Sequence, residues 1–309
     1  MATLTIPAPA KINLSLHVLG RRPDGYHEID SVFHTVGLYD RVTLTDADDG
    51  FTLDCDDAGL VGVDNLVLQA ARAVAGEAGT SRGVSIRLEK SIPAGAGLGG
   101  GSSDAAAVIR GLNLLWGLEW DTPRMCRVAE SVGSDVPFFI HGGAARVRGR
   151  GERVEPLVAQ SGVWCVLLNP GVTMSTAKVF REFAKQKGDT RLTQNRGNSI
   201  ITVARPAESS PDEARIARGG ARVDDADDGV NDLEATACRI EPEVAGALAA
   251  LVAAGGTAAR MSGSGSTVFC VAADEDSAED IRKRIEMAPH WMVWVVPLVG
   301  AETSRPGGF

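Results

Sequence analysis

The feature that most constrains this chain is a glycine-rich loop, Pro93-Ala-Gly-Ala-Gly-Leu-Gly-Gly-Gly-Ser-Ser103, in which five of the nine residues from Gly95 to Ser103 are glycine. Before the loop, residues 84–92 alternate between apolar and polar types, as in a half-buried strand. After it, the apolar residues of 103–116 recur at helical spacing, and we expect Ser102 or Ser103 to cap that helix. A strand, a glycine loop and a helix start together present free N–H groups, which predicts an anion site, most plausibly for phosphate.

The loop does not match the common nucleotide-binding motifs well. Gly95, Gly97 and Gly100 satisfy G-x-G-x-x-G, but a lone match is weak, and a dinucleotide fold requires it directly after the first strand of a βαβ unit. A Walker A loop requires a lysine, and this loop contains none. A tight turn without a ligand remains the structural alternative. The pattern therefore favours a phosphate loop of another design.

The composition is that of a globular protein, with 309 residues, 44% hydrophobic and 23% charged, and this length suits two domains. The net charge of −9 argues weakly against nucleic acid or an anionic membrane as the main partner. The five cysteines are widely spaced and never form C-x-x-C, which indicates reduced thiols without a disulfide frame or zinc site. No signal-peptide pattern and no long apolar run is evident, so we expect a cytoplasmic protein without a membrane span.

The first half of the chain alternates between strand and helix patterns. Strands are predicted at 2–20, 28–37, 40–46 and 51–55, and helices at about 64–78 and 122–132. Residues 144–157 form a predicted basic hairpin with two glycines at its turn, and we interpret its arginines as a solvated face. From pattern alone, Lys11 is typical of a solvated strand lysine and Asp135 of an acidic turn or cap residue.

A domain boundary is predicted near residues 157–162, which divides the chain into 1–160 and 161–309. The second half has strands at 163–168, 257–262, 266–272 and 291–298, and helices at 175–186, 231–253 and 275–287. Apart from one extra helix, this is the β-α-β-β-α-β order of a ferredoxin-like unit. Residues around 187–229 are interpreted as a mobile surface insert. The glycine turn Met261-Ser-Gly-Ser-Gly-Ser-Thr267 is either a plain hairpin turn or a segment that closes over the phosphate loop.

Taken together, three segments resemble the motifs of the GHMP kinases (galacto-, homoserine, mevalonate and phosphomevalonate kinases). The glycine loop resembles the ATP-binding signature of that family, and Pro9-Ala-Lys-Ile-Asn-Leu14 and the 261–267 turn resemble its first and third motifs. The resemblance runs from Pro9 to about Phe269. It implies an α+β, two-domain GHMP kinase fold, with an N-terminal domain like ribosomal protein S5 domain 2 and a ferredoxin-like C-terminal domain.

Within the family, the chain is most similar to the 4-diphosphocytidyl-2-C-methyl-D-erythritol kinase branch. The segments that carry this similarity are Asp24-Gly-Tyr-His27, the extended glycine loop through Ala106, Gly133-Ser-Asp-Val-Pro-Phe138, Gly149-Arg-Gly-Glu152 and Asn231-Asp-Leu-Glu234. The insert looks longer than is usual in this branch. The resemblance implies phosphoryl transfer from ATP to the 2-hydroxyl of 4-diphosphocytidyl-2-C-methyl-D-erythritol, a small molecule, in a step of the non-mevalonate route to isoprenoid precursors. The sequence leaves a monomer and a homodimer open.

The resemblance also assigns roles to individual residues. Asp135 would be the general base on the attacking hydroxyl, and Lys11 would hold that carboxylate ionised and stabilise developing alkoxide charge. Asn13 would orient the erythritol end of the substrate. Tyr26 and His27 match the residues that bind cytosine, with Phe180 stacking on the other side. The alternatives are a turn histidine facing water for His27 and a helix core residue for Phe180.

ATP and Mg²⁺ are the implied cofactors. The ATP-binding residues would be those of the loop, Pro93, Ala94, Gly95, Ala96, Gly97, Leu98, Gly99, Gly100, Gly101, Ser102 and Ser103. Mg²⁺ would bridge phosphate oxygens, with Ser103 as a candidate contact, and would keep several waters. The alternatives are a kinase of the same fold that acts on homoserine or mevalonate, a nicotinamide-dependent oxidoreductase, and a non-catalytic nucleotide-binding relative. The extended loop and Tyr26-His27 argue against the first of these, and the presence of both Lys11 and Asp135 argues against the last.

Overall fold

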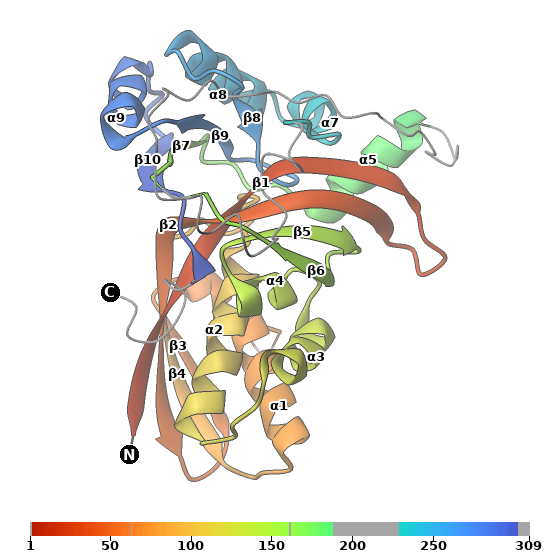
Figure 1. Ribbon diagram of the computed structural model, residues 1–309, viewed down its shortest axis with the longest axis vertical. Coiled ribbons are helices and arrows are strands. Elements are labelled where there is room, and N and C mark those ends of the chain that lie inside the picture. The colour runs from red at the N-terminus through yellow and green to blue at the C-terminus, as the bar shows by residue number, and fades with distance from the viewer. Residues whose placement is uncertain (1, 63, 161, 188–228, 302–309) are drawn as a thin grey trace, which may run out of the picture.

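The computed structural model describes residues 2–62, 64–160, 162–187 and 229–301. Within these ranges the chain forms two sheets with helices packed on them, and the long strands β1 and β2 run between the two parts (Figure 1). The predicted insert lies outside the described residues except at its two ends, and the chain beyond residue 301 also lies outside them.

The first sheet has six strands in the order β3-β4-β2-β5-β6, with β1 pairing with β2. Its strands are β1 (Thr3–Arg21), β2 (His27–Ala47), β3 (Phe51–Cys55), β4 (Gly83–Glu89), β5 (Ala144–Gly149) and β6 (Arg153–Leu157). The prediction of two separate strands at 28–37 and 40–46 was wrong, because β2 is continuous. A register shift opposite Pro9/Ala10 absorbs the two additional residues of β2 and keeps the pairing intact on both sides.

Helices cover one face of this sheet: α1 (Leu66–Ala78), α2 (Gly100–Leu115), α3 (Thr122–Val132) and α4 (Val136–His141) (Figure 1). The central helix α2 lies directly on the β1–β2 pair. A Cβ at Gly111 would lie only 2.2 Å from Ile6 Cδ1 and 2.5 Å from Leu44 Cδ1, so the absence of a side chain permits this close approach. The packing of α2 on β1 fixes the start of α2, and thus the end of the glycine loop, beside the middle of β1.

The second sheet contains β7 (Trp164–Asn169), β8 (Arg260–Met261), β9 (Val268–Ala272) and β10 (Met292–Pro297) in the order β10-β7-β9-β8, with antiparallel neighbours. This order confirms the predicted ferredoxin-like arrangement. Its helices are α5 (Thr176–Lys187), α7 (Glu234–Ile240), α8 (Pro242–Ala253) and α9 (Glu275–Arg284). The single helix predicted at 231–253 is two helices, because Pro242 begins α8 and Glu241 before it is extended, at φ −138° and ψ 96°.

The two parts share a hydrophobic core as well as a chain connection. Ile12 and Leu14 of β1 belong to the same buried cluster as Cys165 and Leu167 of β7. The chain also returns after β10, where Val299 N donates to Thr35 O at 3.0 Å. The buried cluster includes residues from both sides of the predicted domain boundary at 160/161. The boundary itself stays a prediction.

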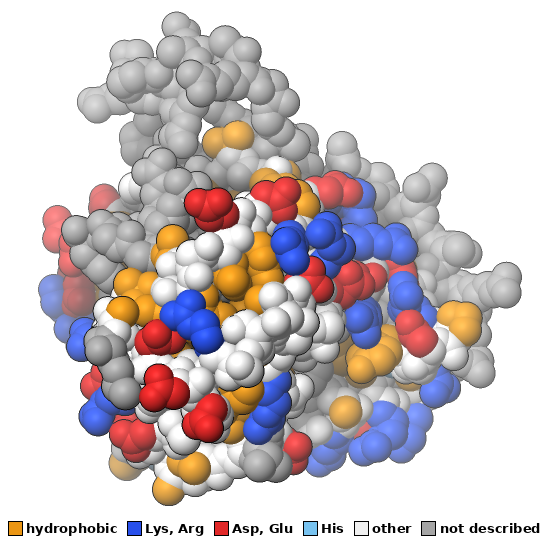
Figure 2. Space-filling view, turned by 90° about the horizontal axis from the view of Figure 1, so that it is seen from below, with side chains coloured by type: hydrophobic (Ala, Val, Ile, Leu, Met, Phe, Trp, Pro, Cys, Tyr) orange, Lys and Arg blue, Asp and Glu red, His pale blue; other side chains and the backbone are white. Residues whose placement is uncertain are grey.

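Basic and acidic side chains lie next to one another on the end of the molecule that Figure 2 shows. In the described part of the chain, no helix is both long and apolar enough to cross a bilayer. All five cysteines are free.

Candidate active site

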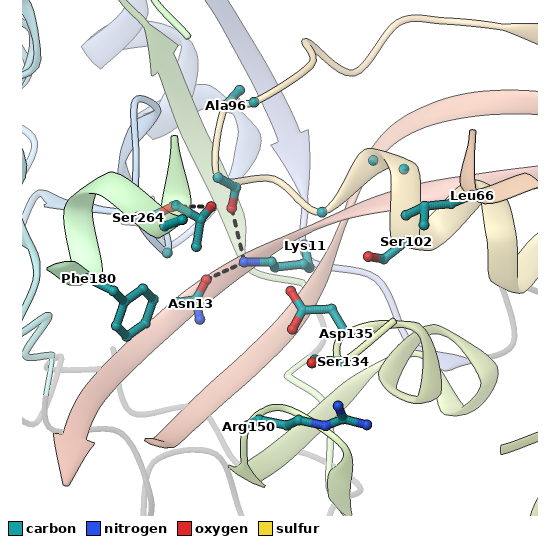
Figure 3. Close-up of a pocket in the computed structure, with 18 of the residues that line it drawn as sticks. Lys11, Asn13, Leu66, Ala96, Ser102, Ser134, Asp135, Arg150, Phe180 and Ser264 are labelled. Atoms are coloured by element: carbon teal, nitrogen blue, oxygen red, sulfur yellow. Dashed lines mark hydrogen bonds between the residues drawn. The ribbon is translucent and has the colours of Figure 1, made fainter. Parts of the chain in front are cut away.

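A cavity of about 1480 Å³ is lined by the glycine loop, β1, α5 and the segment before α4 (Figure 3). Ligand pockets for one small molecule commonly measure about 300–1,000 Å³, so this cavity has room for two ligands side by side. It brings together the three segments that the sequence analysis singled out, around Lys11, Gly97 and Gly263.

The glycine loop alternates two kinds of residue. Gly95, Gly97 and Gly99 have positive φ angles of 64°, 78° and 71°, which favour glycine. The residues between them, Ala96 and Leu98, are buried in the core that β1 and β7 share. The loop is therefore held from beneath by apolar side chains, while its backbone faces the cavity.

The helix after the loop starts without a side-chain cap. Gly99 occupies the N-cap position and α2 begins at Gly100, so the prediction that Ser102 or Ser103 caps it was wrong. The left-handed conformation of Gly99 lets the loop enter the helix directly, and the serines fall inside the first turn. Because no side chain bonds to the first N–H groups, they remain available to an anion at the positive end of the helix dipole.

Most of the predicted ATP residues line the cavity: Pro93 to Gly97 and Gly99 to Ser102. Leu98 and Ser103 do not, since both are buried behind the loop. The Ser103 hydroxyl is fully buried and has no hydrogen-bond partner among the described residues. Its position behind the loop does not support a contact with the nucleotide or a metal.

The predicted catalytic residues lie together (Figure 3). Lys11 is 4% exposed, and its Nζ donates to Gly97 O at 3.0 Å and to Asn13 Oδ1. Asp135 immediately precedes α4, but its side chain makes no capping hydrogen bond. Its carboxylate points toward Lys11, and both residues line the cavity (Figure 3). The interpretation of Lys11 as a solvated lysine was therefore wrong. Asp135 does lie in a turn at the N-cap position of α4, as predicted, but its side chain does not cap the helix.

Burial and mutual attraction act in opposite directions on this pair. Burial lowers the pKa of Lys11, and the Asp135 carboxylate opposes that change. Burial also raises the pKa of Asp135, and the Lys11 ammonium opposes that change. Lys11 therefore favours the ionised carboxylate, as expected. The effect of burial on the pKa of Asp135 is larger than that of Lys11, so the pKa is raised and Asp135 is a stronger proton acceptor than an exposed aspartate.

Asn13 is held from three sides. Its Oδ1 accepts from Lys11, its Nδ2 donates to Ser31 Oγ at 3.0 Å, and its backbone N–H donates to Ser262 Oγ at 3.2 Å. The side chain is 1% exposed and lines the cavity beside Lys11. It is thus oriented before any ligand binds.

At the other end of the cavity lie Tyr26, His27 and Phe180. The rings of His27 and Phe180 stack with centroids 5.0 Å apart, and His27 Nε2 is buried without a partner among the described residues. Tyr26 is 54% exposed. The structure brings the three residues that were predicted to bind cytosine together, with the Phe180 ring packed on His27.

The 261–267 turn, which resembles the third family motif, closes against the phosphate loop. Ser262 Oγ donates to Gly97 O at 2.9 Å, and Thr267 N donates to Ala96 O at 3.1 Å. Asn231 in turn supports the segment, because its Nδ2 donates to Met261 O at 2.8 Å and Gly263 O at 2.9 Å. The turn therefore joins β8 to β9 and also binds the loop, so both interpretations of it apply.

Comparisons with known proteins agree with this arrangement. The family of GHMP kinase N-terminal domains matches residues 65–143, and the GHMP kinase C-terminal family matches residues 223–288. A 4-diphosphocytidyl-2-C-methyl-D-erythritol kinase of Moorella thermoacetica is 39% identical over 93% of this chain and 96% of its own length. The same enzyme of Methylobacterium radiotolerans is 42% identical over 96% of this chain and 99% of its own. This chain belongs to the 4-diphosphocytidyl-2-C-methyl-D-erythritol kinase family of GHMP kinases.

Solved structures place this GHMP kinase in the same fold. A crystal structure of 4-(cytidine 5'-diphospho)-2C-methyl-D-erythritol kinase superposes with a TM-score of 0.72 and 34% identity, over 96% of this chain and all of that one. A homoserine kinase from Cytophaga hutchinsonii superposes with a TM-score of 0.64 at 18% identity, covering 96% of this chain and 95% of its own. The second similarity concerns the fold alone.

The structure adds residues to the site of this GHMP kinase that the sequence did not single out. Arg150 lines the cavity with its guanidinium 5.5 Å over the Tyr26 ring, although its hairpin was interpreted as a solvated face. The cavity also includes Lys90, just before the loop, and Leu66 at the start of α1. The sequence held a signal for two of them, because Lys90 lies next to the loop and Arg150 belongs to the segment Gly149-Arg-Gly-Glu152 that carries the family resemblance. Leu66 reaches the cavity through tertiary packing.

Among the described residues of the GHMP kinase, no group of three or more His, Cys, Asp or Glu could hold a metal by itself. Mg²⁺ commonly binds one or two protein oxygens together with substrate phosphates and waters. The site fits a Mg²⁺ carried on nucleotide phosphates, and Ser102, which lines the cavity (Figure 3), is the loop side chain that would contact it.

Proposed function

We propose that this protein transfers the γ-phosphoryl group of ATP to the 2-hydroxyl of 4-diphosphocytidyl-2-C-methyl-D-erythritol, in the non-mevalonate route to isoprenoid precursors. The observation that carries the proposal is that one cavity contains the uncapped phosphate loop, the Lys11–Asp135 pair and the His27–Phe180 wall. Donor, reacting hydroxyl and pyrimidine each have a matching surface there. Relatives at 39% and 42% identity over nearly the whole chain bear the name of this kinase.

The loop acts on the donor. Its backbone N–H groups from Gly95 to Ser102 and the uncapped start of α2 would bind the β- and γ-phosphates, because they present partial positive charge without a lysine in the loop. Mg²⁺, bound through the phosphates and Ser102, would supply charge neutralisation on the phosphate oxygens. The support of the loop by Ser262 and Thr267 holds these donors in place before ATP binds.

Asp135 and Lys11 act on the acceptor. The Asp135 carboxylate would take the proton of the 2-hydroxyl as its oxygen attacks phosphorus, and its raised pKa suits that role. The Lys11 ammonium, fixed by Gly97 O and Asn13, would stabilise the negative charge that develops between the two groups. Lys11 therefore connects the donor loop to the acceptor site.

The cytidine end would bind at the aromatic wall. His27 Nε2 is buried on the cavity wall and has no hydrogen-bond partner in the part of the chain that the structure describes, so it is available to the edge of a cytosine base. Tyr26 and Phe180 offer ring faces for stacking, and Arg150 beside Tyr26 adds positive charge where an anionic diphosphate would pass. We infer that the enzyme works in the cytoplasm on small molecules, as a monomer or homodimer.

The direct test is to incubate purified protein with Mg-ATP and 4-diphosphocytidyl-2-C-methyl-D-erythritol, and to follow ADP release and the new phosphomonoester by ³¹P NMR. Homoserine and mevalonate serve as alternative acceptors, and Asp135→Asn as the inactive control. We expect turnover with the cytidyl substrate only. Phosphorylation of homoserine or mevalonate but not of the cytidyl compound would assign another kinase of this fold, and NADH binding without ATP binding would assign an oxidoreductase.

A further inference from the structure

Three buried charged residues outside the Lys11–Asp135 pair connect the two ends of the phosphate loop. Asp40 lies on β2, Lys90 follows β4, and Asp104 lies near the start of α2. Lys90 Nζ donates to Asp104 Oδ2 at 2.7 Å and also to Asp40 Oδ2. We call these three residues the loop clasp, because Lys90 lies where the chain leaves β4 toward the loop and Asp104 lies in the first turns of α2, which follows the loop.

Asp40 fixes the entry of the loop. Its Oδ1 accepts the backbone N–H groups of Ser91 at 2.6 Å and Ile92 at 2.8 Å, which immediately precede the first loop residue. The exit of the loop lies against the same carboxylate. A Cβ at Gly100 would be 3.3 Å from Asp40 Oδ2 and 3.0 Å from Ile92 Cγ2, so the glycine allows the two ends to approach.

The clasp is almost completely shielded from water. The side chains of Asp40, Lys90 and Asp104 are 0%, 10% and 2% exposed. Charges buried to this degree are stable only when they are paired and hydrogen-bonded, so the position of Lys90 between the two carboxylates is strongly determined. Burial raises the pKa of Asp104 to about 7, although the Lys90 ammonium acts to lower it. Without Lys90, two carboxylates would face each other directly beneath a loop that binds an anion.

We propose that Lys90 is a positioning residue, which sets the spacing of the two ends of the phosphate loop through Asp40 and Asp104 and so prepares the loop amides for the donor nucleotide. The inference rests on the proposed function for the identity of the donor. The acceptor end is formed by other elements, at Tyr26 and Phe180. A change in the clasp should therefore alter donor binding and leave acceptor binding unchanged.

The test compares Lys90→Met and Asp104→Asn with Arg87→Met. Arg87 also lies on the β4 side of the sheet but forms an exposed pair with Asp54 at 3.4 Å, so it is a matched control for the loss of a charge. The affinities for a non-hydrolysable ATP analogue and for the cytidyl acceptor are measured by calorimetry. Hydrogen exchange of residues 94–101 is measured without any ligand.

Lys90→Met should weaken donor affinity at least about tenfold and speed loop exchange, with acceptor affinity within about twofold of wild type. Asp104→Asn keeps an oxygen for Lys90 and removes one buried negative charge, so donor affinity should equal or exceed that of wild type. Arg87→Met should change neither quantity. A general packing defect would instead lower the affinities for both ligands, and it would lower them in both Lys90→Met and Asp104→Asn.

Unchanged donor affinity and loop exchange in Lys90→Met would overturn the proposal, as would an equal loss for both ligands or a tenfold loss in Asp104→Asn. If Lys90→Met does not fold, Asp104→Ala breaks only the link to α2, and unchanged exchange at residues 99–101 in that variant is equally decisive. A wild type that binds no ATP analogue would refute the proposed function, whereas loop exchange would still report on the clasp.

Discussion

Gly97→Ala should damage both stability and donor binding, because Gly97 lies where the phosphate loop meets the 261–267 turn. Its φ of 78° is unfavourable for alanine by about 1–2 kcal/mol. A Cβ there would also lie 2.3 Å from Ser262 O and 2.9 Å from Gly265 O, which are backbone atoms and cannot rotate away. Forcing the two segments apart adds about 1–3 kcal/mol, as in an overpacked core. The total expected loss is about 2–5 kcal/mol in the free energy of unfolding.

The matched control is Gly101→Ala. Gly101 lies in α2 without a positive φ, and a Cβ there would have Leu66 Cδ1 as its nearest neighbour at an ordinary 3.6 Å. Alanine favours a helix over glycine by up to about 1 kcal/mol, so this variant should unfold at or slightly above the wild-type temperature.

The assay is thermal unfolding followed by circular dichroism, together with titration of a non-hydrolysable ATP analogue. For a chain of this length, about 1.5 °C corresponds to 1 kcal/mol, so Gly97→Ala should lower the midpoint by about 3–8 °C. The substitution should also lower the affinity for the ATP analogue, since Gly97 O accepts hydrogen bonds from Lys11 Nζ and Ser262 Oγ. A midpoint within about 1 °C of wild type, or a larger loss in Gly101→Ala, would refute the close approach on which this reasoning depends.

Four further predictions concern charge and stacking. Asp135→Asn should reduce turnover at least about 10²-fold with ATP affinity near normal, and retained activity would mean that another group takes the proton. Because burial raises the pKa of Asp135, wild-type kcat/KM should fall on acidification at a pH above the value of about 3.9 that is usual for aspartate, and a pH–rate profile measures this limb. Tyr26→Ala should weaken the cytidyl acceptor about tenfold in calorimetry while the ATP analogue binds normally, and equal weakening of both would contradict a stacking role. Burial lowers the pKa of His34 to about 4, so the unfolded chain takes up that proton first, and the free energy of unfolding should fall by up to about 3 kcal/mol between pH 6.5 and 4. In urea denaturation, His34→Gln should show a correspondingly shallower pH dependence, and an unchanged slope would assign the effect to other groups.

The sequence predicted the parts of the site that depend on local chemistry. A glycine run between a strand and a helix predicts an anion loop because few other backbones present so many N–H groups, and the structure has such a loop at residues 93–102. The β-α-β-β-α-β order was also readable, since each element has its own periodicity. The roles of Lys11 and Asp135 came from family resemblance, because pattern alone gives no sign that β1 is buried on both faces.

What the sequence missed depends on tertiary contacts. Arg150 belongs to a hairpin that looks solvated, and it lines the cavity only because that hairpin packs near Asp135, where a Cβ at Gly151 would lie 2.9 Å from Asp135 Oδ1. The expectation of a serine cap on α2 used a sound local rule, but Gly99 satisfies the geometry of that position instead. The role of Lys90 was visible only from its position next to the loop, since its partners lie on β2 and α2.

The continuous cavity of about 1480 Å³ has a consequence for inhibitor design. The donor loop and the aromatic wall line the same cavity, and Lys11 and Asn13 line it as well. Two weak fragments, one bound at each end, could therefore be linked by a short spacer across Lys11. The second fragment would then bind at a millimolar effective concentration, so the joined compound could exceed either fragment in affinity by about 10²–10⁴-fold without any new contact.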